Sequence, residues 1–236
     1  MSKKKKKDEM KTDVLLPLYL YPSSGKNLEI YKRVAKRSKT VSITVILNPN
    51  NGLDSLEPPN RDWKNVVELP FKKTLGYVHL SYMKRDRKLV MKEIQGYAQN
   101  GWNVDGIFFD EAPSNLSCLE AIHELCEYTR KTFKNDHVRI YLNPGVPVDK
   151  KFFDIVDVIV IFENFYRSHW EKFNLRSHCS TKRIASKSAV ILRSVPDTNV
   201  IDILNQLEKF HIGHVFITGI DCEFHTPVKQ YYFEKY

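Results

Sequence analysis

Residues 105–113 read Asp105-Gly-Ile-Phe-Phe-Asp110-Glu111-Ala-Pro113, an apolar run that ends in two adjacent carboxylates and a proline. A continuous apolar run predicts a strand buried on both faces, as in a parallel sheet covered by helices. The carboxyl ends of such strands face the active site, so acids placed there indicate chemistry rather than core packing. A second apolar run, residues 158–162, ends in Glu163 and Asn164 in the same way. Two buried strands that end in acids predict an enzyme that works with carboxylates.

The same unit, an apolar strand followed by a polar loop and usually a helix, repeats along the chain. The predicted strands are Val14–Tyr21, Val41–Asn48, Thr74–Ser81, Gly106–Asp110, Val138–Asn143, Val158–Glu163, Ala189–Ser194 and His214–Thr218. The predicted helices are Leu28–Arg37, Asp86–Gln99, Ser117–Phe133 and Asp197–Phe210, with short or irregular helices in residues 53–70 and 147–154. In the last long helix, Ile201, Leu204 and Leu207 are predicted to be buried.

Eight strands with intervening helices predict an α/β fold, a single-domain (β/α)8 TIM barrel over residues 13–236. An open, doubly wound sheet is the alternative. It is disfavoured because Tyr21-Pro-Ser-Ser-Gly25, the turn after the first strand, is neither a dinucleotide fingerprint nor a P-loop.

The charge of the chain is concentrated at its beginning. The formal net charge is +9, and five of the positive charges are Lys3 to Lys7. Without that run about +4 remains, which is ordinary for a domain of this size. Residues 1–12 are therefore predicted to form a disordered, lysine-rich tail, and nucleic acid is not expected as a partner apart from this tail.

The expected location follows from what the chain lacks. Asp13 interrupts any apolar core of a secretory signal, and no apolar run is long enough to span a membrane. A cytoplasmic location is therefore expected, or a secreted or cell-surface one if translation begins upstream. The four cysteines have no CxxC spacing and the histidines no HExxH spacing, so free thiols, no metal site and no cofactor are expected.

Acids, amides and tyrosines concentrate at the predicted strand ends, together with His79 and Arg193. The candidate catalytic residues are Asp110, Glu111 and Glu163. The candidate substrate-binding residues are Tyr21, Asn48, Tyr77, Tyr82, Asn143, Ser194 and Asp221. Tyrosines stack on sugar rings, amides bond hydroxyl groups and acids transfer protons, so this set predicts a carbohydrate cleft.

Structural roles stay open for several of these residues. Asn48 and Asn143 are also typical turn residues. Asp110 is in a position to cap the helix that follows it, and Glu163 to pair with Arg193 or Arg167.

Hydrolysis of a glycosidic bond needs one protonated carboxyl group and a second carboxylate that serves as nucleophile or base. Side chains of adjacent residues in an extended segment start towards opposite faces, so Asp110 and Glu111 cannot both point straight into the barrel. The hypothesis at this stage is that Glu111 protonates the leaving oxygen and Glu163 lies across the cleft as its partner. Asp110 then raises the pKa of Glu111 or orients a substrate amide or amine.

Seven motifs in order give the chain a resemblance to the spherulation-specific family 4 (spherulin 4) proteins from Val14 onwards. The motifs are Pro17-Leu-Tyr-Leu-Tyr-Pro22, Val45-Ile-Leu-Asn-Pro-Asn50, Gly76-Tyr-Val78, Asp105-Gly-Ile-Phe-Phe-Asp-Glu111, Leu142-Asn-Pro-Gly145, Val160-Ile-Phe-Glu163 and Val215-Phe-Ile-Thr218. These proteins resemble a glycoside hydrolase family that acts on galactosamine-containing polysaccharides. The resemblance implies a (β/α)8 barrel whose essential acids, an Asp-Glu pair and a later Glu, fall on Asp110, Glu111 and Glu163.

Two functions are compatible with the barrel of this sequence, and a third, a nucleic-acid-associated protein, is motivated by the lysine run alone. The first is an endo-acting glycoside hydrolase that cuts a galactosamine-type or related amino-sugar polysaccharide. The alternative is a catalytically silent carbohydrate-binding or differentiation-associated protein on the same barrel. The first is favoured because a pure binding protein has no need of three acids in one cleft.

Overall fold

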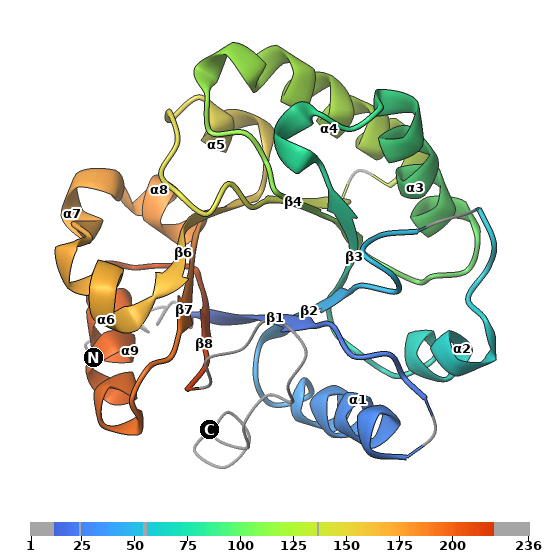
Figure 1. Ribbon diagram of the computed structural model, residues 1–236, viewed down its shortest axis with the longest axis horizontal. Coiled ribbons are helices and arrows are strands. Elements are labelled where there is room, and N and C mark those ends of the chain that lie inside the picture. The colour runs from blue at the N-terminus through green and yellow to red at the C-terminus, as the bar shows by residue number, and fades with distance from the viewer. Residues whose placement is uncertain (1–11, 24, 54–55, 136, 220–236) are drawn as a thin grey trace, which may run out of the picture.

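The computed structural model describes residues 12–23, 25–53, 56–135, 137–219 of the chain. These residues form a closed barrel of eight parallel strands, each paired with the next along the chain and β1 paired with β8 (Figure 1). The strands are β1 Asp13–Leu18, β2 Ile43–Leu47, β3 Thr74–His79, β4 Gly106–Asp110, β5 Arg139–Leu142, β6 Val158–Phe165, β7 Ser188–Arg193 and β8 His214–Ile217. The predicted single-domain (β/α)8 barrel is thereby confirmed, whereas residues 1–11 of the predicted tail lie outside the described ranges.

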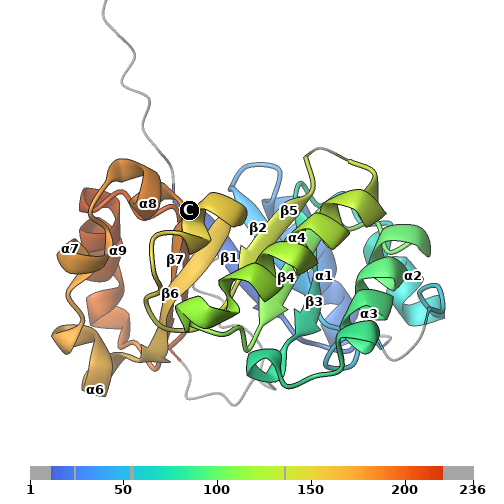
Figure 2. The ribbon, with the colours of Figure 1, turned by 90° about the horizontal axis from the view of Figure 1, so that it is seen from above.

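Helices surround the barrel on its outer side (Figure 1). The α-helices are α1 Lys26–Arg37, α2 Arg61–Val67, α3 Arg87–Gln99, α4 Leu119–Phe133, α5 Phe152–Ile155, α6 Tyr166–His169, α7 Leu175–His178, α8 Lys182–Ser186 and α9 Val200–Lys209. Short 3-10 turns are η1 Ser81–Met83, η2 Leu116–Cys118, η3 Trp170–Lys172 and η4 Asp197–Asn199. Seen from the side, α6 and α8 lie at opposite ends of the barrel (Figure 2).

The segment between β6 and β7 contains helices that the sequence did not predict. In the described chain, α6, α7 and α8 each have only four or five residues. Such lengths are too short to repeat an amphipathic pattern, which is the signal that identifies a helix in a sequence.

The predicted buried face of the last helix needs a correction. Ile201 is 47% exposed, whereas Ile203 and Leu207 are buried and Leu204 is partly buried. Residues 197–199 form the 3-10 turn η4, which has fewer residues per turn than an α-helix. The phase of α9 is therefore shifted relative to a helix counted from Asp197.

One close contact fixes α3 against β3. Gly76 lies under the ring of Tyr97, and a Cβ atom at this position would be 2.5 Å from Tyr97 Cδ1. The Tyr97 hydroxyl donates to the carbonyl oxygen of Tyr77 at 3.1 Å. This contact lets α3 approach the strand whose next residue, Tyr77, points into the barrel.

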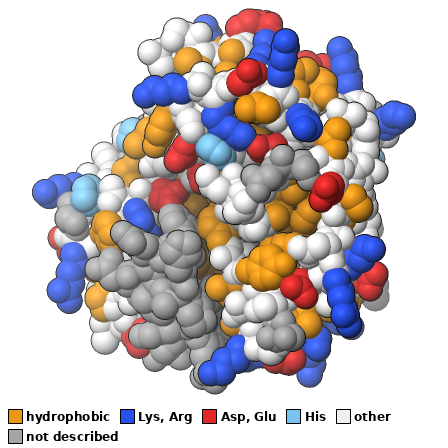
Figure 3. All heavy atoms as spheres, turned by 45° about the vertical axis from the view of Figure 1, so that its right-hand side comes forward, with side chains coloured by type: hydrophobic (Ala, Val, Ile, Leu, Met, Phe, Trp, Pro, Cys, Tyr) orange, Lys and Arg blue, Asp and Glu red, His pale blue; other side chains and the backbone are white. Residues whose placement is uncertain are grey.

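The surface has mixed charge on the face that Figure 3 presents, where acidic, basic and apolar side chains are interspersed. Positive charge is not gathered into one broad patch there. No helix in the described ranges is both long and apolar enough to cross a bilayer.

Replacing Gly76 by alanine should destabilise the fold by about 1–3 kcal/mol, because the new methyl group overlaps the Tyr97 ring. Urea unfolding of the purified protein measures this loss. In a Tyr97→Leu background the same substitution should cost clearly less, since the ring is gone. An equal cost in both backgrounds would mean that strand propensity, and not the contact, limits position 76.

Candidate active site

The centre of the site is the side-chain amide of Asn143, directly after β5. Its Nδ2 donates to Asp110 Oδ1 at 2.6 Å and to Glu163 Oε2 at 2.7 Å. Its Oδ1 accepts from the backbone N–H of Gly145 at 3.0 Å, which fixes the amide with its NH2 group towards the acids. Asn143 itself is only 6% exposed. One buried amide thus joins the carboxyl groups of β4 and β6 across the strand between them.

Backbone hydrogen bonds hold this arrangement in place. Asn143 donates from its N–H to the carbonyl of Phe109 and accepts from the N–H of Ala112. Glu163 donates from its N–H to the carbonyl of Gly145 at 2.9 Å. Gly145 has φ +67, a conformation that favours glycine, and a Cβ there would meet Glu163 Cβ at 3.6 Å. The loop after β5 is therefore shaped around the acids.

The spacing of Asp110 and Glu163 follows from their shared donor. Because both carboxylates accept from one nitrogen, the two bonded oxygens cannot be more than roughly 5 Å apart. Glycosidases that retain anomeric configuration place their two working carboxyl groups about 5–5.5 Å apart, and inverting enzymes place them about 6.5–9.5 Å apart. The upper bound set by the shared donor on the two bonded oxygens agrees with the shorter of these ranges.

Both carboxyl groups have raised pKa values. Burial is the main cause for Asp110, against which hydrogen bonds from Tyr77 and Asn143 lower its pKa. Burial and then the charge of Asp110 raise the pKa of Glu163, while Asn143 and the charge of Arg193 lower it. The pair therefore holds a proton more readily than two exposed carboxylates would.

The two acids differ in their hydrogen bonds. Asp110 accepts a second one, at 2.8 Å from the Tyr77 hydroxyl to Oδ2. Burial and the charge of Asp110 raise the pKa of Tyr77, so its phenol stays protonated and donates. The ring of Tyr19 packs edge-on against Tyr77 at 5.3 Å. Donors on both oxygens favour the ionised form of Asp110 over that of Glu163.

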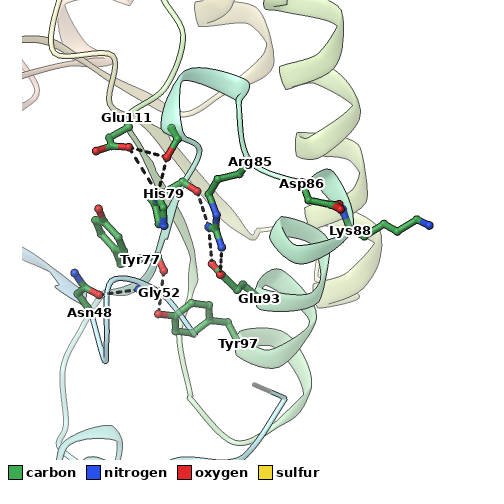
Figure 4. A network of polar contacts seen from close by, with 11 residues as sticks. Asn48, Gly52, Tyr77, His79, Arg85, Asp86, Lys88, Glu93, Tyr97 and Glu111 are labelled. Carbon is green, nitrogen blue, oxygen red and sulfur yellow. Dashed lines mark hydrogen bonds and ion pairs between the residues drawn. The ribbon is translucent and has the colours of Figure 1, made fainter. Parts of the chain in front are cut away.

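Glu111 belongs to a second group at the rim. Its side chain is 46% exposed, and its Oε2 accepts from the Ser81 hydroxyl at 3.1 Å (Figure 4). His79 Nδ1 lies 3.1 Å from Ser81 Oγ and 3.7 Å from the same Glu111 oxygen. Adjacent acids thus contribute to separate clusters. The φ of 47° at Glu111 takes this residue out of the extended conformation and directs its side chain to the rim.

The backbone of this rim is strained. Glu111 has φ 47, and Ser81, Tyr82 and Met83 have φ values of 46, 56 and 67. The N–H of Tyr82 donates to the carbonyl of Glu111 at 2.7 Å and ties the two segments together. Consecutive non-glycine residues with positive φ are costly and concentrate at functional sites.

An ion pair supports the rim from below. Arg85 pairs with Glu93 of α3, which is 7% exposed, and also donates to the carbonyl of His79 at 2.7 Å (Figure 4). Gly52, with φ +116, passes over the Glu93 carboxylate, where a Cβ would be 2.8 Å from Oε2. Asn48, predicted to bind substrate, accepts from the N–H of Gly52 at 3.0 Å and so closes this turn.

The other predicted substrate-binding residues occupy different places. Tyr77 and Asn143 bond the acids, while Tyr82 is 59% exposed at the rim. Tyr21 is 47% exposed, accepts from Asn60 Nδ2 at 3.1 Å and lines a side hollow of about 360 Å³ with Trp63.

Two more predicted residues complete this set. Ser194, with φ 55, directly follows β7, and its buried hydroxyl has no hydrogen-bond partner among the described residues. Asp221 lies outside the described ranges.

The contacts bear on the alternative structural roles of Asp110 and Glu163. Asn115, and not Asp110, caps the turn before α4, by accepting from the N–H of Ser117 at 3.0 Å. The Arg193 charge acts on Glu163, and its guanidinium lies over the Phe165 ring at 4.5 Å. Ser81 was not predicted to be a site residue, because a single serine at the end of a strand has no distinguishing signal in the sequence. No His, Cys, Asp and Glu cluster in the described ranges is arranged to hold a metal ion.

The sequence model of the spherulation-specific family 4 matches residues 13–235. Spherulin-4 of Physarum polycephalum is 34% identical over 154 residues, which cover 64% of this chain and 44% of that protein. The chain therefore spans less than half of this relative.

Two solved structures share the fold. Aspergillus clavatus Sph3, in complex with GalNAc, has a TM-score of 0.78 at 24% identity over 94% of both chains. The glycoside hydrolase domain of PgaB (BpsB) from Bordetella bronchiseptica has a TM-score of 0.56 at 8% identity, over 88% of this chain and 94% of that domain. The barrel is thus of a kind that glycoside hydrolases use.

Removing one acid of this partly buried pair should stabilise the protein more at pH 7 than at pH 4. Below the ordinary carboxyl pKa the group is protonated in both the folded and the unfolded chain, so its raised pKa costs no folding stability. As the pH rises from there through the raised folded-state pKa, folding stability is lost, because the unfolded chain releases the proton more easily. Glu163→Gln should therefore raise the melting temperature at pH 7 by roughly 2–4 °C for each kcal/mol of unfolding free energy that is regained. At pH 4 the same substitution should change the melting temperature little. Exposed Glu208→Gln is the control, and an equal response of both variants would contradict the burial argument.

Proposed function

The chain belongs to the spherulation-specific family 4, and on this basis we propose that it is a glycoside hydrolase acting on an amino-sugar polysaccharide that contains galactosamine. The observation that carries the proposal is the pair Asp110 and Glu163, bound to one amide nitrogen. Support for the substrate class comes from the GalNAc-bound Sph3, and support for the reaction class from the hydrolase domain of PgaB.

The hydrogen bonds suggest how the pair divides the work. With one proton between them, the two donors to Asp110 favour the charge on Asp110 and the proton on Glu163. Glu163 is then the general acid, and its raised pKa keeps the proton available. Asp110 is the carboxylate that faces the positive charge developing at the anomeric carbon.

The proposed reaction has two steps and retains configuration. Glu163 protonates the glycosidic oxygen while Asp110 attacks the anomeric carbon, so the bond to the leaving sugar breaks and a glycosyl ester with Asp110 forms. Glu163, now ionised, takes a proton from water, whose oxygen attacks the same carbon and releases Asp110 as a carboxylate. The short spacing of the two carboxyl groups supports this course over an inverting one.

Glu111 takes a different role in this scheme from the one in the sequence-based hypothesis. Its carboxylate lies at the exposed rim with Ser81 and His79, where it can bond a hydroxyl or amino group of the substrate. The earlier hypothesis, in which Glu111 is the acid, remains the competing assignment within the same reaction.

A catalytically silent carbohydrate-binding protein is the alternative function. The raised pKa values of Asp110 and Glu163 weigh against it, because holding two acids close together at low exposure costs stability that binding alone does not require.

Substitution of the acids should distinguish these possibilities. Reducing-end release from a galactosamine-containing polysaccharide should fall by about 10³-fold or more in Asp110→Asn and Glu163→Gln, because each removes a group that reacts. Glu111→Gln should lose less, mainly through a higher KM, and Glu208→Gln should match the wild type. The general acid produces the limb of the pH–rate profile that falls at high pH. If this limb disappeared in Glu111→Gln alone, Glu111 would be the general acid. Binding without release by the wild type would favour the silent protein.

Asn143→Ala should change the pH profile as well as the rate. Its amide lowers the pKa of both acids, so its loss should move both limbs of the profile to higher pH and lower kcat by about 10²-fold. The measurement is kcat against pH, with Asn143→Gln as the variant that keeps the donor. A lower rate with unmoved limbs would mean that Asn143 serves the fold and not the acids.

A further inference from the structure

A basic hollow lies away from the acid pair, between α7, α8 and the end of α9. It has a volume of about 310 Å³. Arg176 of α7, Lys182 of α8 and Lys209 of α9 line it, together with His211. No carboxylate is among its lining residues.

The hollow lies towards the amino-terminal end of the barrel. Lys187 and Ser188 lead from α8 into β7, and Gly213 leads from α9 into β8. The acid pair lies at the other end, where β4 and β6 finish. Figure 2 shows the same separation, with α8 and α6 at opposite ends.

Close packing of two turns brings the cations together. The N–H of Gly213 donates to the carbonyl of Ala185 at 3.0 Å. A Cβ on Gly213 would lie 1.9 Å from the carbonyl oxygen of Ser186, so only glycine permits this approach. The end of α8 and the turn after α9 are thus held side by side, with Lys182 and Lys209 on the walls of one hollow.

The cations of the hollow lack counter-charges. Within the described ranges, the side chains of Arg176, Lys182 and Lys209 form no ion pair or hydrogen bond. The adjacent Arg183, by contrast, pairs with Asp154. All three side chains are exposed, so water solvates their charges, and an anion entering the hollow would meet them without displacing an existing ion pair.

The remaining lining groups suit an oxyanion. Ser180 and Thr181 bring hydroxyl groups, which are neutral donors, to the same hollow. Burial raises the pKa of the Cys179 thiol, so this neighbour stays protonated and adds no negative charge. Arginine and lysine with hydroxyl donors form the donor set that binds phosphate and sulfate groups.

We propose that this hollow binds the phosphate or sulfate group of a small soluble molecule. Arg176, Lys182 and Lys209 neutralise the tetrahedral oxyanion, and Ser180 and Thr181 donate to its oxygens. The volume is within the range of small-molecule sites and exceeds what a single ion needs, so it leaves room for the organic part of a phosphorylated or sulfated compound. The site is independent of the proposed hydrolysis.

Calorimetric titration of the full chain with inorganic phosphate, sulfate and glucose 6-phosphate at constant ionic strength tests the proposal. Arg176→Ala/Lys182→Ala should weaken binding of each probe by at least about tenfold, because two charge-assisted contacts are lost. The matched control is Arg61→Ala/Lys64→Ala on α2, which removes the same two residue types from exposed positions outside the hollow and should bind as the wild type does. Unchanged melting curves show that the variants are folded.

Several outcomes would overturn the proposal. The first is wild-type binding of the three probes no stronger than that of chloride, and the second is equal losses in both double variants. A third is binding only to vesicles of phosphatidylcholine and phosphatidic acid, with none to the soluble probes, which would assign the cations to a membrane surface. Tighter binding of glucose 6-phosphate than of inorganic phosphate would support a small organic ligand.

Discussion

The site depends on one interaction, the double donation from the Asn143 amide to Asp110 and Glu163. An amide nitrogen has two hydrogens at a fixed angle, so it sets both the distance and the relative direction of the carboxyl groups. The N–H of Gly145 occupies the amide oxygen and prevents the reversed orientation. A neutral donor also adds no positive charge next to the pair, which a lysine at this position would.

The barrel places these groups and the helices hold the strands. Strands β4, β5 and β6 are neighbours, so Asp110, Asn143 and Glu163, which lie at or near the carboxyl ends of these strands, meet at one point of the rim. The Arg85–Glu93 pair and the Gly76–Tyr97 contact join α3 to β3 and to the loop that follows it. These buried contacts of α3 thus fix the positions of the side chains at the barrel mouth, while the exposed rim at Glu111 keeps its strained backbone.

The sequence was sufficient for the barrel, because most strands are continuous apolar runs, and for the position of two acids, because Asp110 and Glu163 follow such runs directly. It was insufficient to separate Asp110 from Glu111, since their division into two clusters depends on a positive φ at Glu111 that no residue type signals. The bridging role of Asn143 was hidden for a similar reason, because asparagine before proline is equally typical of a turn. Asn48 illustrates the opposite outcome: it also precedes a proline and was predicted to bind substrate, but its amide closes a turn.

The pairing of β1 with β8 has a consequence for the order of events during synthesis. On a ribosome the strands emerge one after another, and the ring cannot close until β8 has been made. Until then β1 presents an open edge, with Val14 and its neighbours available to pair with any other strand. The acid pair of β4 and β6 is complete on the chain well before closure. The nascent barrel therefore contains its site residues before its first strand has a partner. Only synthesis of β8 allows the edge of β1 to be covered.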